Sequence, residues 1–182
     1  MEAFYMRRAI ELANLAVSNG AQPYGALIAD PATDTILAEG CNSATENPIW
    51  HGEMAAIQNL SSTGVNVYAV APDLELYTTA EPCSMCMSAI SWSGFGRVVF
   101  GTSIPFIEGQ GAPQIDIRAV DVVAASTTLE HNITVVGGVL RNETDPLYVK
   151  CGERCRHGAA GDHDHGQDHG HDHSHDHDQG HR

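Results

Sequence analysis

Two cysteines have the residue type and the spacing of metal ligands. Cys83 and Cys86 lie three residues apart in the run PCSMC at 82–86, directly after an apolar run at 74–79. If Pro82 opens a helix, where its missing N–H leaves no bond unmade, both thiols lie on one face of the first turn. The positive end of the helix dipole favours thiolates there, and the thiolate is the form that binds metal. We therefore predict that this turn supplies two ligands of a metal site.

A histidine and a glutamate further upstream extend the pattern. His51 and Glu53 stand in the triplet HGE at the start of a segment with helical spacing at 51–60. A catalytic zinc ion takes three protein ligands and keeps a fourth position for water. A His-x-Glu triplet followed by Pro-Cys-x-x-Cys is the signature of zinc deaminases. On these motifs, the chain resembles the cytidine deaminase-like superfamily over roughly residues 9–147.

The resemblance implies one catalytic zinc ion per chain, held by His51, Cys83 and Cys86. It also implies hydrolysis of an exocyclic amine to a carbonyl with release of ammonia. Zinc lowers the pKa of its bound water to about 7, so that hydroxide is available at neutral pH. Glu53 is not a ligand in this family, but carries the proton from water to the ring nitrogen and then to the leaving amine. A carboxylate suits this task because it can act as base and as acid within one cycle.

The sequence around the cysteines bears on the substrate. The runs at 76–83 and 89–92 resemble guanine deaminases of this fold, whereas HGE with LYTT also resembles fungal-type cytosine deaminases. Guanine deaminases carry a further acidic residue after the cysteines, for which Asp116 and Glu108 are the candidates. Asp116 lies nearer the expected spacing, although the sequence at 109–114 departs from that branch. We expect a guanine-like purine slightly ahead of cytosine.

Three other residues are candidates for substrate binding. Asn42 is similar to the base-binding asparagine of guanine and tRNA adenosine deaminases, and a side-chain amide both donates and accepts hydrogen bonds. Asparagine is also favoured in turns, so a purely structural role stays open. Ala26 belongs to a Pro-x-Gly-Ala element that lies beside the active site in this superfamily, although Gly25 there could serve only close backbone approach. Trp92 is the third candidate.

Strand-like and helix-like segments alternate along the chain, each bounded by Gly, Pro, Asn, Asp or Ser. The expected helices lie at 2–18, 51–60, 83–92, 115–125 and 140–150. The expected strands lie at 23–29, 35–41, 74–79, 97–101 and 134–136. This alternation predicts an α/β fold with three α/β/α layers around a mixed five-stranded sheet, which is also the fold that the resemblance implies.

The end of the chain has a different composition. Eight of the eleven histidines lie between residues 163 and 181, interleaved with aspartates. Such a segment cannot build a core, so we expect a deaminase domain at 1–157 and a disordered tail at 158–182. The tail could gather divalent metals, or it could have no role. A second, weaker candidate metal site consists of Cys151, Cys155 and His157.

The net charge of −14 bears on partners. Six aspartates and one arginine from residue 162 onward contribute −5, which leaves −9 for the rest of the chain. Acidic proteins are poor electrostatic partners for nucleic acid, so a tRNA or DNA substrate is disfavoured but not excluded. We expect a small nucleobase or nucleoside as substrate, and a homodimer by resemblance. A metal-handling protein that uses the tail is the alternative outside enzymes.

Two further expectations concern location. No stretch reaches the roughly twenty apolar residues of a membrane span. Five cysteines, two of them expected to bind metal, indicate a reducing compartment, which favours the cytoplasm.

Overall fold

Five strands form one mixed sheet in the order β2-β1-β3-β4-β5. The computed structural model describes residues 1–129 and 132–149. The strands are β1 (Gly25–Asp30), β2 (Thr35–Cys41), β3 (Glu75–Ala80), β4 (Arg97–Thr102) and β5 (Thr134–Gly137). Strand β1 is antiparallel to both β2 and β3, whereas β3, β4 and β5 run parallel to one another. The predicted mixed five-stranded sheet is therefore confirmed.

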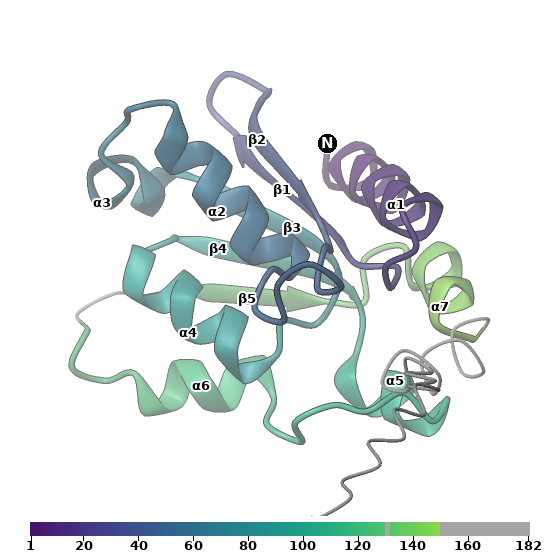
Figure 1. Cartoon of the computed structure of the whole chain (residues 1–182). Coiled ribbons are helices and arrows are strands. Elements are labelled where there is room, and N and C mark those ends of the chain that lie inside the picture. The colour runs from purple at the N-terminus through teal and green to yellow at the C-terminus, as the bar shows by residue number, and fades with distance from the viewer. Residues whose placement is uncertain (130–131, 150–182) are drawn as a thin grey trace, which may run out of the picture.

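Helices cover both faces of this sheet. They are α1 (Glu2–Ser18), α2 (Gly52–Ser62), α3 (Val67–Val70), α4 (Ser84–Ser93), α5 (Ile104–Gly109), α6 (Ala119–Ala125) and α7 (Arg141–Val149), with a short 3-10 turn η1 (Ala71–Asp73). Helices α2, α4 and α6 lie on one face, and α1 and α7 lie on the other side (Figure 1). The three α/β/α layers agree with the prediction.

The three central strands β1, β3 and β4 are buried on both faces, whereas the edge strands β2 and β5 are partly exposed. Along β1, Ile28 packs into the core under α2 and α4, and its neighbour Leu27 packs into the core under α1. Val98 and Val99 of β4 divide between the same two cores. Strands that are covered on both sides have no solvent face, which explains why they read as continuous apolar runs.

Two glycines let helices lie directly on strands. A Cβ at Gly25 would lie 2.3 Å from the carbonyl oxygen of Ala9 in α1. A Cβ at Gly40 would lie 2.3 Å from the carbonyl oxygen of Gly52, the first residue of α2. Close backbone approach, one of the two roles considered for Gly25, is therefore present. At Gly40 the same approach sets the position of the helix that follows His51.

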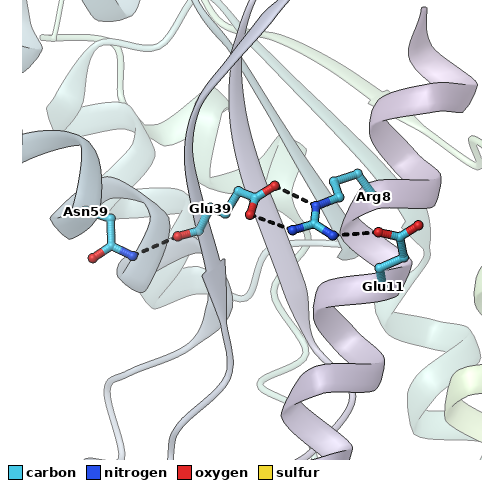
Figure 2. A network of polar contacts seen from close by, with 4 residues as sticks. All are labelled: Arg8, Glu11, Glu39 and Asn59. Carbon is cyan, nitrogen blue, oxygen red and sulfur yellow. Dashed lines mark hydrogen bonds and ion pairs between the residues drawn. The ribbon is translucent and has the colours of Figure 1, made fainter.

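A polar network ties α1 and α2 to the edge strand β2 (Figure 2). The Arg8 guanidinium donates to both carboxylate oxygens of Glu39, at 2.6 and 2.8 Å, and to Glu11 at 2.6 Å. On the other side of the strand, Asn59 Nδ2 donates to the backbone carbonyl of Glu39 at 2.8 Å (Figure 2). The network occupies a backbone acceptor of an edge strand that would otherwise be open to pairing with another chain.

Two predicted helix starts were wrong, and helices α3 and α5 were not predicted. Helix α4 begins at Ser84 with Cys83 as its N-cap, so Pro82 precedes the helix and does not open it. The helix expected at 115–125 begins only at Ala119. Its apolar residues at 115 and 117 are exposed and face no core, so their helical spacing has no packing to stabilise it.

Other predictions lie outside the described residues. These are the domain boundary at 157, the tail at 158–182 and the second metal site at Cys151, Cys155 and His157. Within the described ranges, no helix has the length and hydrophobicity needed to cross a membrane.

Candidate active site

The residues expected to do chemistry lie at one end of the central strands. Strand β3 ends at Ala80, immediately before the loop that carries Cys83. Because β1 runs antiparallel to β3, with Ala26 opposite Thr78, the start of β1 lies at the same end of the sheet as the end of β3. Ligand sites in open α/β sheets commonly form beyond the carboxyl ends of the parallel strands.

The three predicted metal ligands lie together at this end of the sheet. His51 and Cys83 are the N-cap residues of α2 and α4, both with extended backbone, and Cys86 lies in the first turn of α4. His51 Nδ1 lies 3.7 Å from Cys83 Sγ and 3.6 Å from Cys86 Sγ. Tetrahedral zinc, with Zn–S of about 2.3 Å and Zn–N of about 2.0–2.1 Å, would place nitrogen and sulfur about 3.5 Å apart. The residues present therefore fit a zinc ion.

The two thiols and the imidazole shift one another's pKa values. The hydrogen bond with Cys86 lowers the pKa of Cys83 to about 4, and the same bond raises the pKa of the Cys86 thiol. The hydrogen bond with Cys83 raises the pKa of His51. Cys83 is therefore the first of the two to become a thiolate, the form required of a metal ligand.

Glu53 stands two residues after the ligand His51 and is buried. Its side chain is in the first turn of α2, and its Oε1 accepts a hydrogen bond from Thr78 Oγ1 at 3.2 Å. Burial raises the pKa of Glu53, with the Cys83 charge adding to the effect. A raised pKa brings a carboxyl group nearer to exchanging its proton at neutral pH, which is the property needed in general acid–base chemistry.

Tyr24 is a neighbour of the site that the sequence analysis missed. Its ring lies parallel to the His51 imidazole, with 6.5 Å between ring centroids and 9° between planes. Its hydroxyl accepts a hydrogen bond from Gln114 Nε2 at 3.1 Å, and burial raises its pKa to about 12. An aromatic residue directly before the Gly-Ala pair was the available signal, because that element was already expected beside the active site.

Two substrate-binding candidates are buried at the same end of the sheet. Asn42 follows β2, and its side chain accepts from the backbone N–H of Ala44 at 3.3 Å and donates to the Gln22 carbonyl at 3.4 Å. These contacts are those of a turn residue, and a role in substrate binding stays a prediction. Ala26 is fully buried in β1, next to the first residue of α2, Gly52.

Three other candidates are more exposed. Trp92 lies near the carboxyl end of α4, away from the ligands at its start, with 62% of its surface exposed. Asp116 is exposed in the segment before α6, and Glu108 is half-buried on α5. Their roles stay predictions.

A groove of about 390 Å³ lies elsewhere, between α1, the edge strand β2 and α2. It is lined on the α2 side by Trp50 and Met54 and on the α1 side by Leu12 and Leu15. None of the three candidate metal ligands lines it.

Comparisons with known proteins agree with this geometry. Residues 1–102 match the family described as "Cytidine and deoxycytidylate deaminase zinc-binding region". The chain is 33% identical over 147 residues to a probable cytosine deaminase of Schizosaccharomyces pombe, covering 76% of this chain and 85% of that protein. It is 30% identical over 141 residues to a tRNA-specific adenosine deaminase of Rickettsia typhi, covering 74% and 86%. The structure of a guanine deaminase from Nitrosomonas europaea aligns with a TM-score of 0.69 over 83% of this chain and 84% of that one, at 22% identity. At that identity, the structural likeness shows the fold alone.

Proposed function

The chain belongs to the cytidine and deoxycytidylate deaminase zinc-binding family, and from this premise we propose that it deaminates a small free nucleobase, with Glu53 as the proton carrier. His51, Cys83 and Cys86 form the zinc site of this family, and the chain is a zinc-dependent nucleobase or nucleoside deaminase. The observation that carries the proposal is the position of a buried carboxylate, Glu53, beside three converging ligand atoms.

The proposed reaction exchanges an exocyclic amine for a carbonyl oxygen. When bound, zinc supplies a Lewis-acid centre that brings the pKa of water towards neutrality. Glu53 takes a proton from water at its carboxylate and gives it to the ring nitrogen, while the water oxygen forms a bond to the carbon that carries the amine. Glu53 then carries the second proton of that oxygen to the amine, and the C–N bond breaks to release ammonia and leave the carbonyl. The hydroxyl of Thr78 holds the carboxylate in place through its hydrogen bond to Oε1. The raised pKa of Glu53 suits a group that must both accept and release a proton.

Two neighbouring residues suit a planar, polar-edged substrate. The Tyr24 ring and the His51 imidazole are parallel, and aromatic faces bind flat heterocycles by stacking. The amide of Asn42 can donate to and accept from the edge of a base, and its present bonds of 3.3 and 3.4 Å are long enough to exchange for better ones. We propose that these groups receive the base.

A guanine-like purine is the first substrate to test, because the runs at 76–83 and 89–92 resemble guanine deaminases. Cytosine is the second, and one observation favours it: the similarity to a probable cytosine deaminase spans 85% of that relative. Asp116, followed by Glu108, remains our candidate for the additional acid of the guanine branch. The exposed position of Asp116 requires that a bound substrate bring it closer.

The test is ammonia release from purified, zinc-loaded protein with guanine, guanosine, adenine, adenosine, cytosine and cytidine. The same protein carrying Glu53→Gln is the blank. One strong substrate that is lost in the blank supports the proposal and identifies the base. Zinc at one per chain with no release from any of the six would overturn the free-base proposal. Activity on a tRNA transcript alone would instead favour the nucleic-acid branch, which the chain's acidic charge opposes.

We also propose a homodimer. Trp50, Trp92 and Val120 are large apolar residues with 46%, 62% and 52% of their surfaces exposed. They lie on or next to the helices that cover one face of the sheet (Figure 1). The proposal of a homodimer rests on the family resemblance, and we propose these three side chains as contacts of its interface. Light scattering during size-exclusion chromatography should give twice the mass of one chain, and a monomer mass at micromolar concentration would refute it.

A further inference from the structure

Glu81 is a buried carboxylate that none of the chemistry above uses. It stands two residues before Cys83, and its side chain is 1% exposed. One oxygen accepts the backbone N–H of Ile104 and the other that of Ala119, each at 3.0 Å. Arg118 Nε donates to both oxygens, at 2.8 and 2.9 Å. A single carboxylate therefore bonds the first residue of α5 and the first residue of α6, and we call this set of contacts the clamp.

These bonds close a loop in the chain. Residues 104 and 119 are the two ends of one segment, so Glu81 holds both ends to the strand-to-helix connection that carries the zinc ligand Cys83. Strand β4 supports the same point, because the Glu81 N–H donates to the Thr102 carbonyl at 2.7 Å. Charged hydrogen bonds of this kind, withdrawn from solvent, are strong and have defined directions.

The middle of the same segment reaches the neighbour of His51. Ala112 is buried in a small apolar cluster with Ala80 and Tyr148, against which Tyr24 packs. Gln114 Nε2 donates to the Tyr24 hydroxyl. Tyr24 in turn presents its ring parallel to the His51 imidazole. Contacts therefore run without a gap from Glu81, through segment 104–119, to the aromatic ring beside the zinc site.

We propose that Glu81 is a positioning residue, which keeps segment 104–119 against Tyr24 so that the aromatic surface beside His51 is formed before substrate arrives. The proposal rests on the proposed function in one respect, namely that a planar base binds at Tyr24. A carboxylate is required because all its partners are donors. An amide in its place would turn an N–H group towards one of those donors and leave the charge of Arg118 without its partner.

The variant Glu81→Gln tests the proposal. The matched control is Glu143→Gln, which breaks the surface ion pair between Glu143 and Arg7, distant in sequence from the clamp. Hydrogen–deuterium exchange of peptides covering 104–119 should become about tenfold to a hundredfold faster in Glu81→Gln and stay unchanged in the control. Arg118→Gln keeps the two backbone bonds to Glu81, so exchange at 104–119 should rise by a smaller factor. If Glu81→Gln does not fold, Arg118→Gln takes its place in the exchange measurement.

Two further readouts separate positioning from general stability. Zinc should remain at one per chain, since all three ligands are intact. For the base that the wild-type enzyme deaminates, KM should rise about tenfold or more while kcat stays within about threefold, because the stacking surface is loosened and the proton carrier is untouched. Unchanged exchange at 104–119 would overturn the clamp, and so would faster exchange with an unchanged KM. If the wild-type enzyme deaminates no free base, the proposed function fails, and exchange then decides the clamp by itself.

Discussion

Cys86 Sγ lies 3.6 Å from His51 Nδ1, although Cys86 lies in the first turn of α4 and His51 is the N-cap of a different helix, α2. Both helices begin at the same end of the sheet and cover the same face of it (Figure 1). Their positive ends thus point at one place, where thiolate and carboxylate groups gather.

Cys86→Ala should remove the metal. With one of three ligands gone, we expect zinc affinity to fall by more than about 100-fold, because the loss of even an outer partner reduces it by about 10–100-fold. The measurement is zinc per chain by elemental analysis after dialysis against a weak chelator. Cys41→Ala is the control, since Cys41 is a free thiol of β2 outside the ligand cluster. Stoichiometric zinc in Cys86→Ala would contradict the site.

Glu53→Gln should keep zinc and lose turnover. Gln matches the shape of Glu but cannot carry a proton, and general acid–base groups contribute about 10²–10⁴-fold to rate. Steady-state ammonia release and zinc content, measured on the same sample, check both halves. Glu46→Gln, which changes an exposed carboxylate in the loop before His51, should leave both unchanged. A Glu53→Gln enzyme of near-normal rate would refute the role of Glu53.

Gly40→Ala should destabilise the protein and disturb the site. The new Cβ would lie 2.3 Å from the Gly52 carbonyl oxygen and 2.4 Å from the Ala56 nitrogen, so α2 must move away from β2. We expect a loss of about 3 kcal/mol in the free energy of unfolding, at the upper end of overpacking effects, together with weaker zinc binding. Gly109→Ala is the matched control, because its Cβ would meet nothing within 4 Å. Urea unfolding of both variants measures the difference, and equal midpoints would show that α2 can shift freely.

The Arg8–Glu39 pair should make a small, pH-dependent contribution to stability (Figure 2). The hydrogen bond with Arg8 lowers the pKa of Glu39 in the folded protein. A lowered carboxyl pKa stabilises the fold at pH values above the unfolded pKa, and this contribution is lost as pH falls through the folded pKa. Both side chains are about one-third exposed, so solvent screening limits the effect to roughly 0.5–1 kcal/mol.

The variant Glu39→Gln should therefore lower the free energy of unfolding at pH 7 and have little effect at a pH below the lowered pKa of Glu39 in the folded protein. Urea unfolding at the two pH values provides the comparison, with Glu46→Gln as an unpaired reference. A loss that is equal at both pH values would mean that packing, and not charge, explains the contact.

Deletion of the residues after Arg156 should leave turnover and one bound zinc per chain. The predicted zinc ligands and proton carrier all precede residue 87, and the histidines of the tail offer only additional metal binding. Ammonia release and isothermal titration with Zn²⁺ compare the full chain with the shortened one. Turnover that disappears with the tail would favour the metal-handling alternative.

Much of the fold was predictable because it depends on local pattern. The helix at 2–18 and the strand at 35–41 match the structure residue for residue. Regular apolar spacing identifies each element, and the turn residues that flank it indicate where it ends. The failures lie where local pattern and packing disagree. Residues 115–118 have helical spacing but no core to pack on, and α5 is a short helix whose first N–H is bonded by a carboxylate more than twenty residues earlier.

The sequence by itself determined the ligand set, because His51, Cys83 and Cys86 are chemically distinctive and their local spacing depends only on helix geometry. It also determined the layer order, because strands that alternate with helices have few ways to bury their apolar faces. Tertiary structure alone decided which further residues surround the ligands. Tyr24, Gln114 and Glu81 reach the site through contacts between segments far apart in the chain, and the types of these residues are common elsewhere in proteins. Such positions depend on how strands pair and helices pack, which no local spacing encodes.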